Sequence, residues 1–123
     1  MKAAIYARTA VRKQSPHNDG IRMQIEVCMK FANENGYQVT GVFTDVGYSG
    51  LRLDRPGLDK MRKLIARQSI DAVVVSDLWR LTRSAKDNAC LEREFADSGV
   101  ELRCVASKRG IMTAQLIHVQ ASR

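Results

Sequence analysis

Short apolar runs alternate along the chain with stretches of helical periodicity. Each run is bounded by polar residues or by glycine, as strands are. The run at 71–76 contains three consecutive valines, a pattern typical of a strand covered on both faces. The pattern predicts strands at residues 3–7, 38–44, 71–76 and 100–105.

Between these runs, apolar residues recur at the three-to-four-residue spacing of an amphipathic helix. Gly36 suits the left-handed residue that closes a helix, and Pro56 suits a first helical turn. Ser84 and Asp87 resemble a capping box. We therefore expect helices over residues 21–32, from Pro56 onward and from Ser84 to near Gly99, and residues 111–119 are compatible with a weaker one.

The alternation of strands and helices predicts the fold class. It favours a single α/β domain over residues 1–123, with a mainly parallel central sheet flanked by helices in three layers. Sites in such folds lie beyond the C-terminal ends of the strands. Residues 8–10, 45–47 and 77–83 are therefore expected along one edge of the domain. The pattern does not determine the order of the strands.

The charge of the chain narrows the class of partner. The 123 residues carry a net charge of +7, and 13 of the 20 cationic residues are arginines. The planar guanidinium group binds phosphate oxygens in pairs, whereas lysine is a point charge. The composition therefore favours a nucleic-acid partner. The alternative is a soluble protein with an ordinary basic surface.

Other compositional features exclude several classes. No run of about 18 apolar residues and no charged-then-apolar leader is present, so we predict neither a membrane span nor a signal peptide. The cysteines, Cys28, Cys90 and Cys104, are odd in number and widely spaced, which favours a reduced cytoplasm over a disulfide framework. With His17 and His118 as the only histidines, we expect no metal site and no cofactor.

Four arginines follow predicted strands or lie on loops at the same predicted edge. Arg8 comes directly after a buried strand, and Arg55 lies on a loop. Arg80 and Arg83 are three residues apart, so on a helix they share a face, with Leu78 and Leu81 on the other. Converging guanidinium groups repel one another unless an anion lies among them, and phosphate is the natural candidate. The alternative is solvated charge with salt bridges to Asp45, Asp54 or Asp77.

Five short motifs occur in one order along the chain. Residues 6–14 read Tyr-Ala-Arg-Thr-Ala-Val-Arg-Lys-Gln, and Met23-Gln24 opens the next motif. Residues 45–50 read Asp-Val-Gly-Tyr-Ser-Gly and residues 54–58 read Asp-Arg-Pro-Gly-Leu. The strand at 71–75 is followed by Leu-Trp-Arg-Leu-Thr-Arg at 78–83. In this order and at these separations, the chain resembles the resolvase/invertase family of serine recombinases over nearly its full length.

The resemblance implies a chemistry. Members of this family cut DNA by phosphoryl transfer from a serine hydroxyl, without a metal, leaving a 5′-phosphoserine linkage and a free 3′-hydroxyl. They act as dimers or tetramers on DNA. By this likeness Arg8, Arg80 and Arg83 contact the scissile phosphate and Arg55 assists in the same pocket. The likeness also implies that Gln14 and Gln24 shape the site and that Asp45 orients an arginine.

Two residues depart from the family pattern. The nucleophilic serine lies four residues after the tyrosine, and here that position is Ala10, whose methyl group cannot attack phosphorus. Neighbouring residues at a strand end face opposite ways, so we expect the hydroxyl of Thr9 to point off the phosphate, and Ser15 reaches it only after a rearrangement. Trp79 stands where the family usually has Asp, and it is either a packing residue or an exposed aromatic that meets a partner.

Three interpretations remain open at this stage. In the first, the chain is a truncated recombinase catalytic domain that is active in its native form and whose serine has been replaced on purpose. In the second, it is a naturally inactive recombinase that acts as a DNA-binding or oligomerising regulator. In the third, it is a decayed remnant of a mobile element. Family members continue into a long helix and a DNA-binding domain, both of which we expect to be missing from these 123 residues. Retention of Arg8, Arg80 and Arg83 counts against decay, because an unpaired cationic cluster costs stability. Trp79 counts against the first interpretation, because disabling the nucleophile does not require a second change.

Overall fold

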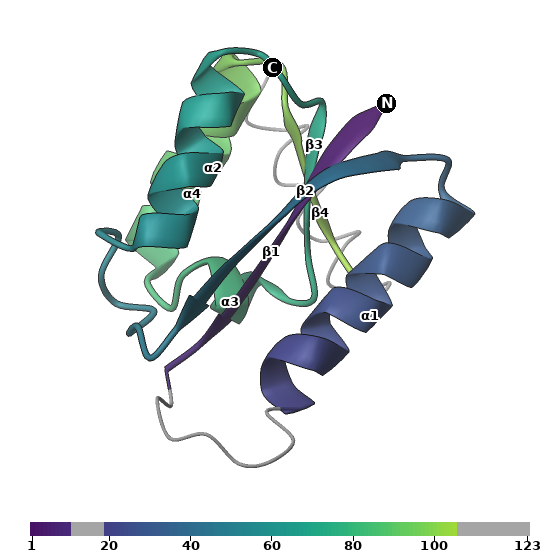
Figure 1. Cartoon of the computed structure of the whole chain (residues 1–123). Coiled ribbons are helices and arrows are strands. Elements are labelled where there is room, and N and C mark those ends of the chain that lie inside the picture. Colours follow the sequence, from purple (N-terminus) through teal and green to yellow (C-terminus); the bar gives the residue numbers. More distant parts are fainter. Residues whose placement is uncertain (11–18, 106–123) are drawn as a thin grey trace.

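Strands and helices alternate from the N-terminus (Figure 1). The computed structural model describes residues 1–10 and 19–105. Within them lie β1 (Lys2–Thr9), α1 (Asp19–Glu34), β2 (Gln38–Val46), α2 (Pro56–Ala66), β3 (Ala72–Val75), α3 (Leu78–Leu81), α4 (Ala85–Asp97) and β4 (Glu101–Cys104). Gln14, Ser15 and the weak helix expected at 111–119 lie outside the described residues.

The strands form one sheet in the order β2-β1-β3-β4, and every pairing is parallel. Helix α1 covers one face of this sheet, while α2 and α4 lie side by side on the other (Figure 1). The predicted three-layer α/β fold is therefore confirmed. The first strand of the sequence lies inside the sheet, between β2 and β3.

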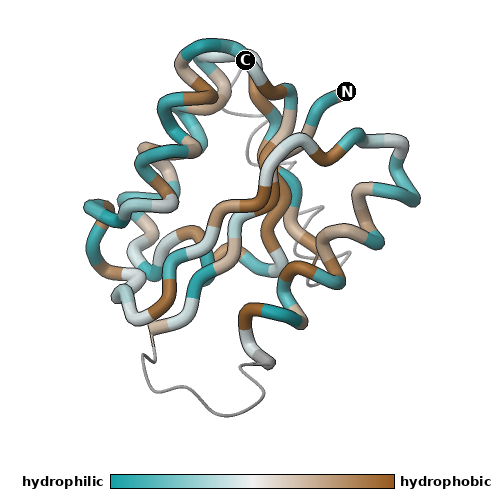
Figure 2. Tube along the Cα trace, viewed as in Figure 1, coloured by the Kyte–Doolittle hydropathy of each residue, from teal (hydrophilic) through white to brown (hydrophobic). Residues whose placement is uncertain are grey.

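Two hydrophobic clusters, one on each face, hold the layers together. Alternate residues of β1 divide between them: Ala4 and Tyr6 face α2 and α4, whereas Ala3 and Ile5 face α1. All four residues of β3 are fully buried, which explains its unbroken β-branched pattern. Figure 2 shows this division, with apolar residues concentrated on the central strands and polar residues on the outer sides of the helices.

The helix ends follow local sequence signals. The Ser84 side chain accepts a hydrogen bond from the backbone N–H of Asp87 at 3.2 Å, so the predicted cap is present. Helix α2 begins at Pro56, as expected. Gly36 and Gly99, with φ of 75° and 74°, follow the ends of α1 and α4 in the left-handed conformation that glycine tolerates.

The parallel arrangement brings three loops to one edge of the sheet. Arg8 pairs in register with Asp45, and Tyr6 pairs with Val75. The segments after β1, β2 and β3 therefore leave the sheet side by side. No helix in the described ranges is long and apolar enough to be a candidate membrane span.

Candidate functional site

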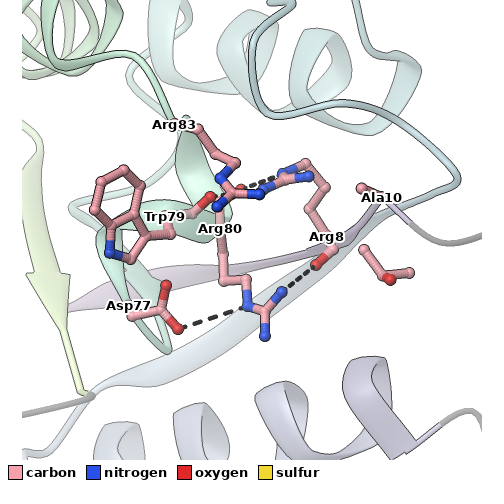
Figure 3. Close-up of a pocket in the computed structure, with 7 residues that line it drawn as sticks. Arg8, Ala10, Asp77, Trp79, Arg80 and Arg83 are labelled. Carbon is pink, nitrogen blue, oxygen red and sulfur yellow. Dashed lines mark hydrogen bonds and ion pairs between the residues drawn. The ribbon is translucent and has the colours of Figure 1, made fainter.

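A pocket of about 380 Å³ opens at the edge where β1 and β3 end. Figure 3 shows its side chains, which come from the end of β1 and from the segment that contains α3. The lining residues are Arg8, Thr9, Ala10, Asp77, Trp79, Arg80 and Arg83. Three guanidinium groups thus face one carboxylate, which makes the pocket cationic.

Arg8 is fixed by main-chain carbonyl groups. Its Nε donates to the carbonyl of Arg80 at 3.0 Å, Nη2 to that of Trp79 at 2.7 Å, and Nη1 to that of Tyr48 at 2.9 Å. The side chain is only 2% exposed. Because these carbonyls belong to the segments after β2 and β3, Arg8 ties both segments to the end of β1.

Gln24 holds the backbone of Arg8. Its Oε1 accepts from the Arg8 N–H and its Nε2 donates to the Arg8 carbonyl, both at 3.0 Å. Gln24 is buried on α1 and does not line the pocket. It contributes to the site by fixing the strand end on which Arg8 lies.

Arg80 and Arg83 reach the same pocket by different routes. Helix α3 ends at Leu81 and Thr82 has extended backbone with φ of −162°, so the expectation that both arginines share one helical face is wrong. Arg80 lies on the helix, where its Nε is 3.5 Å from Asp77 Oδ2. Arg83 follows the helix and is exposed. The extended backbone at Thr82 ends the helical periodicity between the two arginines, and both still line the pocket.

Arg55 does not line the pocket, contrary to the expected convergence of four arginines. It is fully buried, and its guanidinium donates to the Tyr6 hydroxyl at 2.8 Å and to the carbonyls of Leu81 and Arg52, each at 2.6 Å. The carbonyls draw the side chain beneath α3. Arg55 therefore supports the segment that carries Arg80 and Arg83 from inside the protein.

Asp45 caps helix α2. Its carboxylate accepts from the backbone N–H groups of Gly57 at 2.8 Å and Leu58 at 3.0 Å, and from the Tyr6 hydroxyl at 2.7 Å. Within the described residues no arginine donates directly to Asp45. The Tyr6 hydroxyl, which accepts from Arg55, connects the two, so any orienting effect of Asp45 on an arginine passes through Tyr6.

Ala10 is exposed at a bend directly after β1 and contributes a methyl group to the pocket. Thr9, the last residue of β1, lines the pocket as well. That its hydroxyl points off a bound phosphate stays a prediction. Gln14, expected to shape the site, lies outside the described ranges.

The electrostatics of the site favour an anion. Burial lowers the pKa of Arg8, and the positive charges of Arg55, Arg80 and Arg83 lower it further. Arginine nevertheless stays protonated in proteins, so the cluster keeps its mutual repulsion. An anion among Arg8, Arg80 and Arg83 relieves that repulsion, whereas Asp77 offsets only part of it. In the described part of the chain, no group of three or more His, Cys, Asp or Glu is placed to hold a metal ion.

Gly50 is a site residue to which the sequence assigned no role. Its carbonyl accepts from the backbone N–H of Arg83 at 2.9 Å and from the Thr82 hydroxyl at 2.8 Å. A Cβ atom at this position would collide with Arg83 Cγ and lie 2.7 Å from Arg8 Nη2. The glycine in this loop was visible in the sequence, but only the fold shows which arginines it touches.

Comparison with known proteins identifies relatives over most of the chain. The family model described as resolvase, N-terminal domain, matches residues 3–121. The R46 site-specific recombinase of Escherichia coli is 32% identical over 100 residues, which are 81% of this chain and 46% of that protein. The transposon Tn3 resolvase of Escherichia coli is 30% identical over 100 residues, 81% and 48% of the two chains. This chain spans about half the length of these relatives.

Solved structures agree with the sequence comparison. The N-terminal catalytic domain of TP901-1 integrase matches with a TM-score of 0.81 and 28% identity, covering 99% of this chain and 95% of that one. The C-terminal catalytic domain of ISC1926 TnpA, an IS607-like serine recombinase, matches with a TM-score of 0.78 and 31% identity, covering 99% and 82%.

Replacement of Tyr6 by Phe should lower the free energy of unfolding by about 1–3 kcal/mol, because it removes the buried acceptor of Arg55 Nη1 and the donor to Asp45. Urea denaturation measures this loss. The matched control is Tyr48→Phe, because the hydrogen bond that Tyr48 accepts from Arg8 uses its main-chain carbonyl, which the substitution keeps. Equal stability of the two variants would contradict the proposed role of Tyr6.

The same variant should change the pH dependence of stability. Burial raises the pKa of Tyr6 above its ordinary value, with a smaller contribution from its bond to Asp45. The unfolded chain releases this proton near pH ~10 while the folded chain keeps it, so the contribution of Tyr6 is complete below that pH and is lost as the pH rises further. Stability of Tyr6→Phe should therefore decline less steeply above pH ~10 than that of the parent.

Replacement of Gly50 by Ala should destabilise the protein by about 1–3 kcal/mol, because the added methyl group displaces Arg83 and Arg8. Gly20→Ala is the control, since nothing lies within 4 Å of a Cβ atom there. Thermal or urea unfolding compares the two. A Gly50→Ala protein as stable as Gly20→Ala would show that the arginines do not pack against Gly50 as described.

Proposed function

Because this chain belongs to the resolvase family of site-specific recombinases, we propose that its pocket binds a backbone phosphate of DNA through Arg8, Arg80 and Arg83. The chain then serves site-specific DNA recombination, as its relatives do. The observation that carries the proposal is the convergence of these three guanidinium groups on one pocket beside position 10.

The geometry suits a phosphoryl group in two ways. Guanidinium groups match phosphate oxygens with paired N–H donors. Arg8 is already held by three main-chain carbonyls, so little reorganisation is needed when the anion arrives. Tyr6, Gln24, Asp45 and Arg55 are positioning residues in this scheme, because they fix the elements that carry the three pocket arginines. Gln14 keeps its predicted role of shaping the site.

Position 10 corresponds to the nucleophilic serine of the family. In the family reaction a serine Oγ bonds to phosphorus, the bond from phosphorus to the 3′ oxygen breaks, and the 3′ oxygen leaves as a hydroxyl. Arginines stabilise the negative charge that spreads over the phosphoryl oxygens. Ala10 has no atom that can form the new bond. We infer that the chain binds DNA at this pocket and does not cleave it by the family mechanism.

Ala10 and Trp79 together favour a second candidate function, that of a regulator. Both depart from the family pattern, while the three pocket arginines are kept. This combination favours a catalytically inactive regulator that binds DNA or pairs with active copies, as a dimer or tetramer on DNA. A cytoplasmic location remains a prediction for both functions.

Replacement of Arg80 by Ala should weaken DNA binding about equally for all sequences and reduce the slope of log affinity against log salt by roughly one unit. Fluorescence anisotropy of labelled duplex DNA over a range of salt concentrations measures the slope. Arg93→Ala removes the same charge from the exposed surface of α4 and should leave the slope unchanged. An unchanged slope in Arg80→Ala would refute phosphate binding in the pocket.

Replacement of Ala10 by Ser distinguishes the two functions. The substrate is an activated phosphodiester with a nitrophenolate leaving group, which requires no target sequence. If only the nucleophile is missing, the serine Oγ introduced by Ala10→Ser loses its proton to solvent and bonds to phosphorus as nitrophenolate leaves, and mass spectrometry detects the resulting serine phosphodiester. The parent and the double variant Ala10→Ser, Arg80→Ala should remain unmodified. An unmodified single variant that still binds DNA would favour the regulator.

A further inference from the structure

Trp79 is an exposed aromatic residue at a cationic pocket. Its side chain is 61% exposed, and among the exposed large apolar residues of the described chain it alone lines the pocket. In Figure 3 the indole lies on the side of the pocket away from Ala10, beside Asp77 and Arg83. It is also the sole tryptophan of the chain.

The backbone of Trp79 is fixed, although its side chain extends outward. Its carbonyl accepts from Arg8 Nη2 at 2.7 Å, and the next residue is the pocket arginine Arg80. The Arg83 guanidinium lies 5.8 Å from the centre of the indole ring. Trp79 is therefore not a packing residue of the core. The fold holds its position beside the arginines and leaves most of the ring accessible.

An exposed aromatic ring next to a phosphate-binding pocket suits a nucleic acid with an accessible base. In a nucleic acid each phosphate is joined through a sugar to a base, so a chain that enters the pocket brings a base close to its rim. Bases stack on exposed aromatic side chains whatever their sequence, and a neighbouring arginine adds a cation–π contribution. Bases inside an intact duplex already stack on their neighbours, so a base that is unpaired or splayed out fits best.

We propose that Trp79 stacks on an unpaired base of DNA next to the phosphate held by Arg8, Arg80 and Arg83. The inference rests on the proposed function and extends it to the form of DNA that the chain prefers. Trp79 gives the pocket a preference for single-stranded or locally opened DNA over closed duplex.

The test uses the emission of Trp79 and three DNA probes with the full chain. The probes are a single strand of mixed sequence, an abasic strand of equal length that carries the same phosphates, and the closed duplex. Stacking should quench the emission with the single strand, while the abasic strand and the duplex leave it nearly unchanged. Because Trp79 is the sole tryptophan, the signal has one source.

Affinity measurements with variants separate stacking from charge. Trp79→Ala should weaken binding of the single strand by about 5- to 150-fold and leave the abasic strand unaffected. Trp79→Phe should retain most of the affinity because it keeps a ring. Leu51→Ala, which removes an apolar side chain of similar exposure (67%) outside the pocket lining, should change neither probe.

The outcomes distinguish this inference from the proposed function. If Arg80→Ala weakens both strands while Trp79→Ala weakens neither, the phosphate site stands and base stacking is refuted. Equal affinity for the base-bearing and abasic strands refutes stacking as well. If no probe binds the parent chain, or if Arg80→Ala changes nothing, the phosphate site itself is refuted and the stacking proposal falls with it.

Discussion

The architecture of the pocket depends on the hydrogen bonds from Arg8 to three main-chain carbonyls. These bonds join the end of β1 to the carbonyl of Tyr48 in the loop after β2 and to the carbonyls of Trp79 and Arg80 in α3, which follows β3. Three of the five N–H groups of the Arg8 guanidinium donate these hydrogen bonds. Arg8, which the resemblance assigns to phosphate contact, therefore also holds the segments around the pocket together. Its position is set before any ligand arrives, which suits a site that works by electrostatic preorganisation.

A second, fully internal charge supports the same segment. Arg55 bonds to the Leu81 carbonyl on one side and, through the Tyr6 hydroxyl, connects to Asp45 on the other. A buried charge is tolerated only when hydrogen bonds replace its lost hydration, and each donor nitrogen of Arg55 has such a partner. The site thus divides its arginines between two tasks. Three face the pocket, and the fourth holds the helix from which Arg80 extends.

The sequence predicts the elements of this fold well and the directions of its side chains poorly. Apolar periodicity and caps such as Ser84 are local signals, so they locate strands and helices and, through the parallel fold, the edge that bears the site. The order of the strands and the burial of Arg55 depend on contacts between distant segments. Arg83 lines the pocket from beyond the end of α3, after the extended backbone at Thr82, which no helical spacing predicts. The direction of a side chain on a loop depends on which main-chain carbonyls the tertiary fold places within hydrogen-bond distance. The sequence does not show which carbonyls these are.

The central claim is that the three arginines of the pocket hold a phosphate of DNA beside residue 10. A crystal structure of the full chain with a short DNA strand tests it most directly. We expect a backbone phosphorus among the guanidinium groups of Arg8, Arg80 and Arg83, with an oxygen in hydrogen-bond reach of at least two of them and the Ala10 methyl group facing it. DNA bound on another surface, with the arginine pocket free of phosphate, would contradict the account.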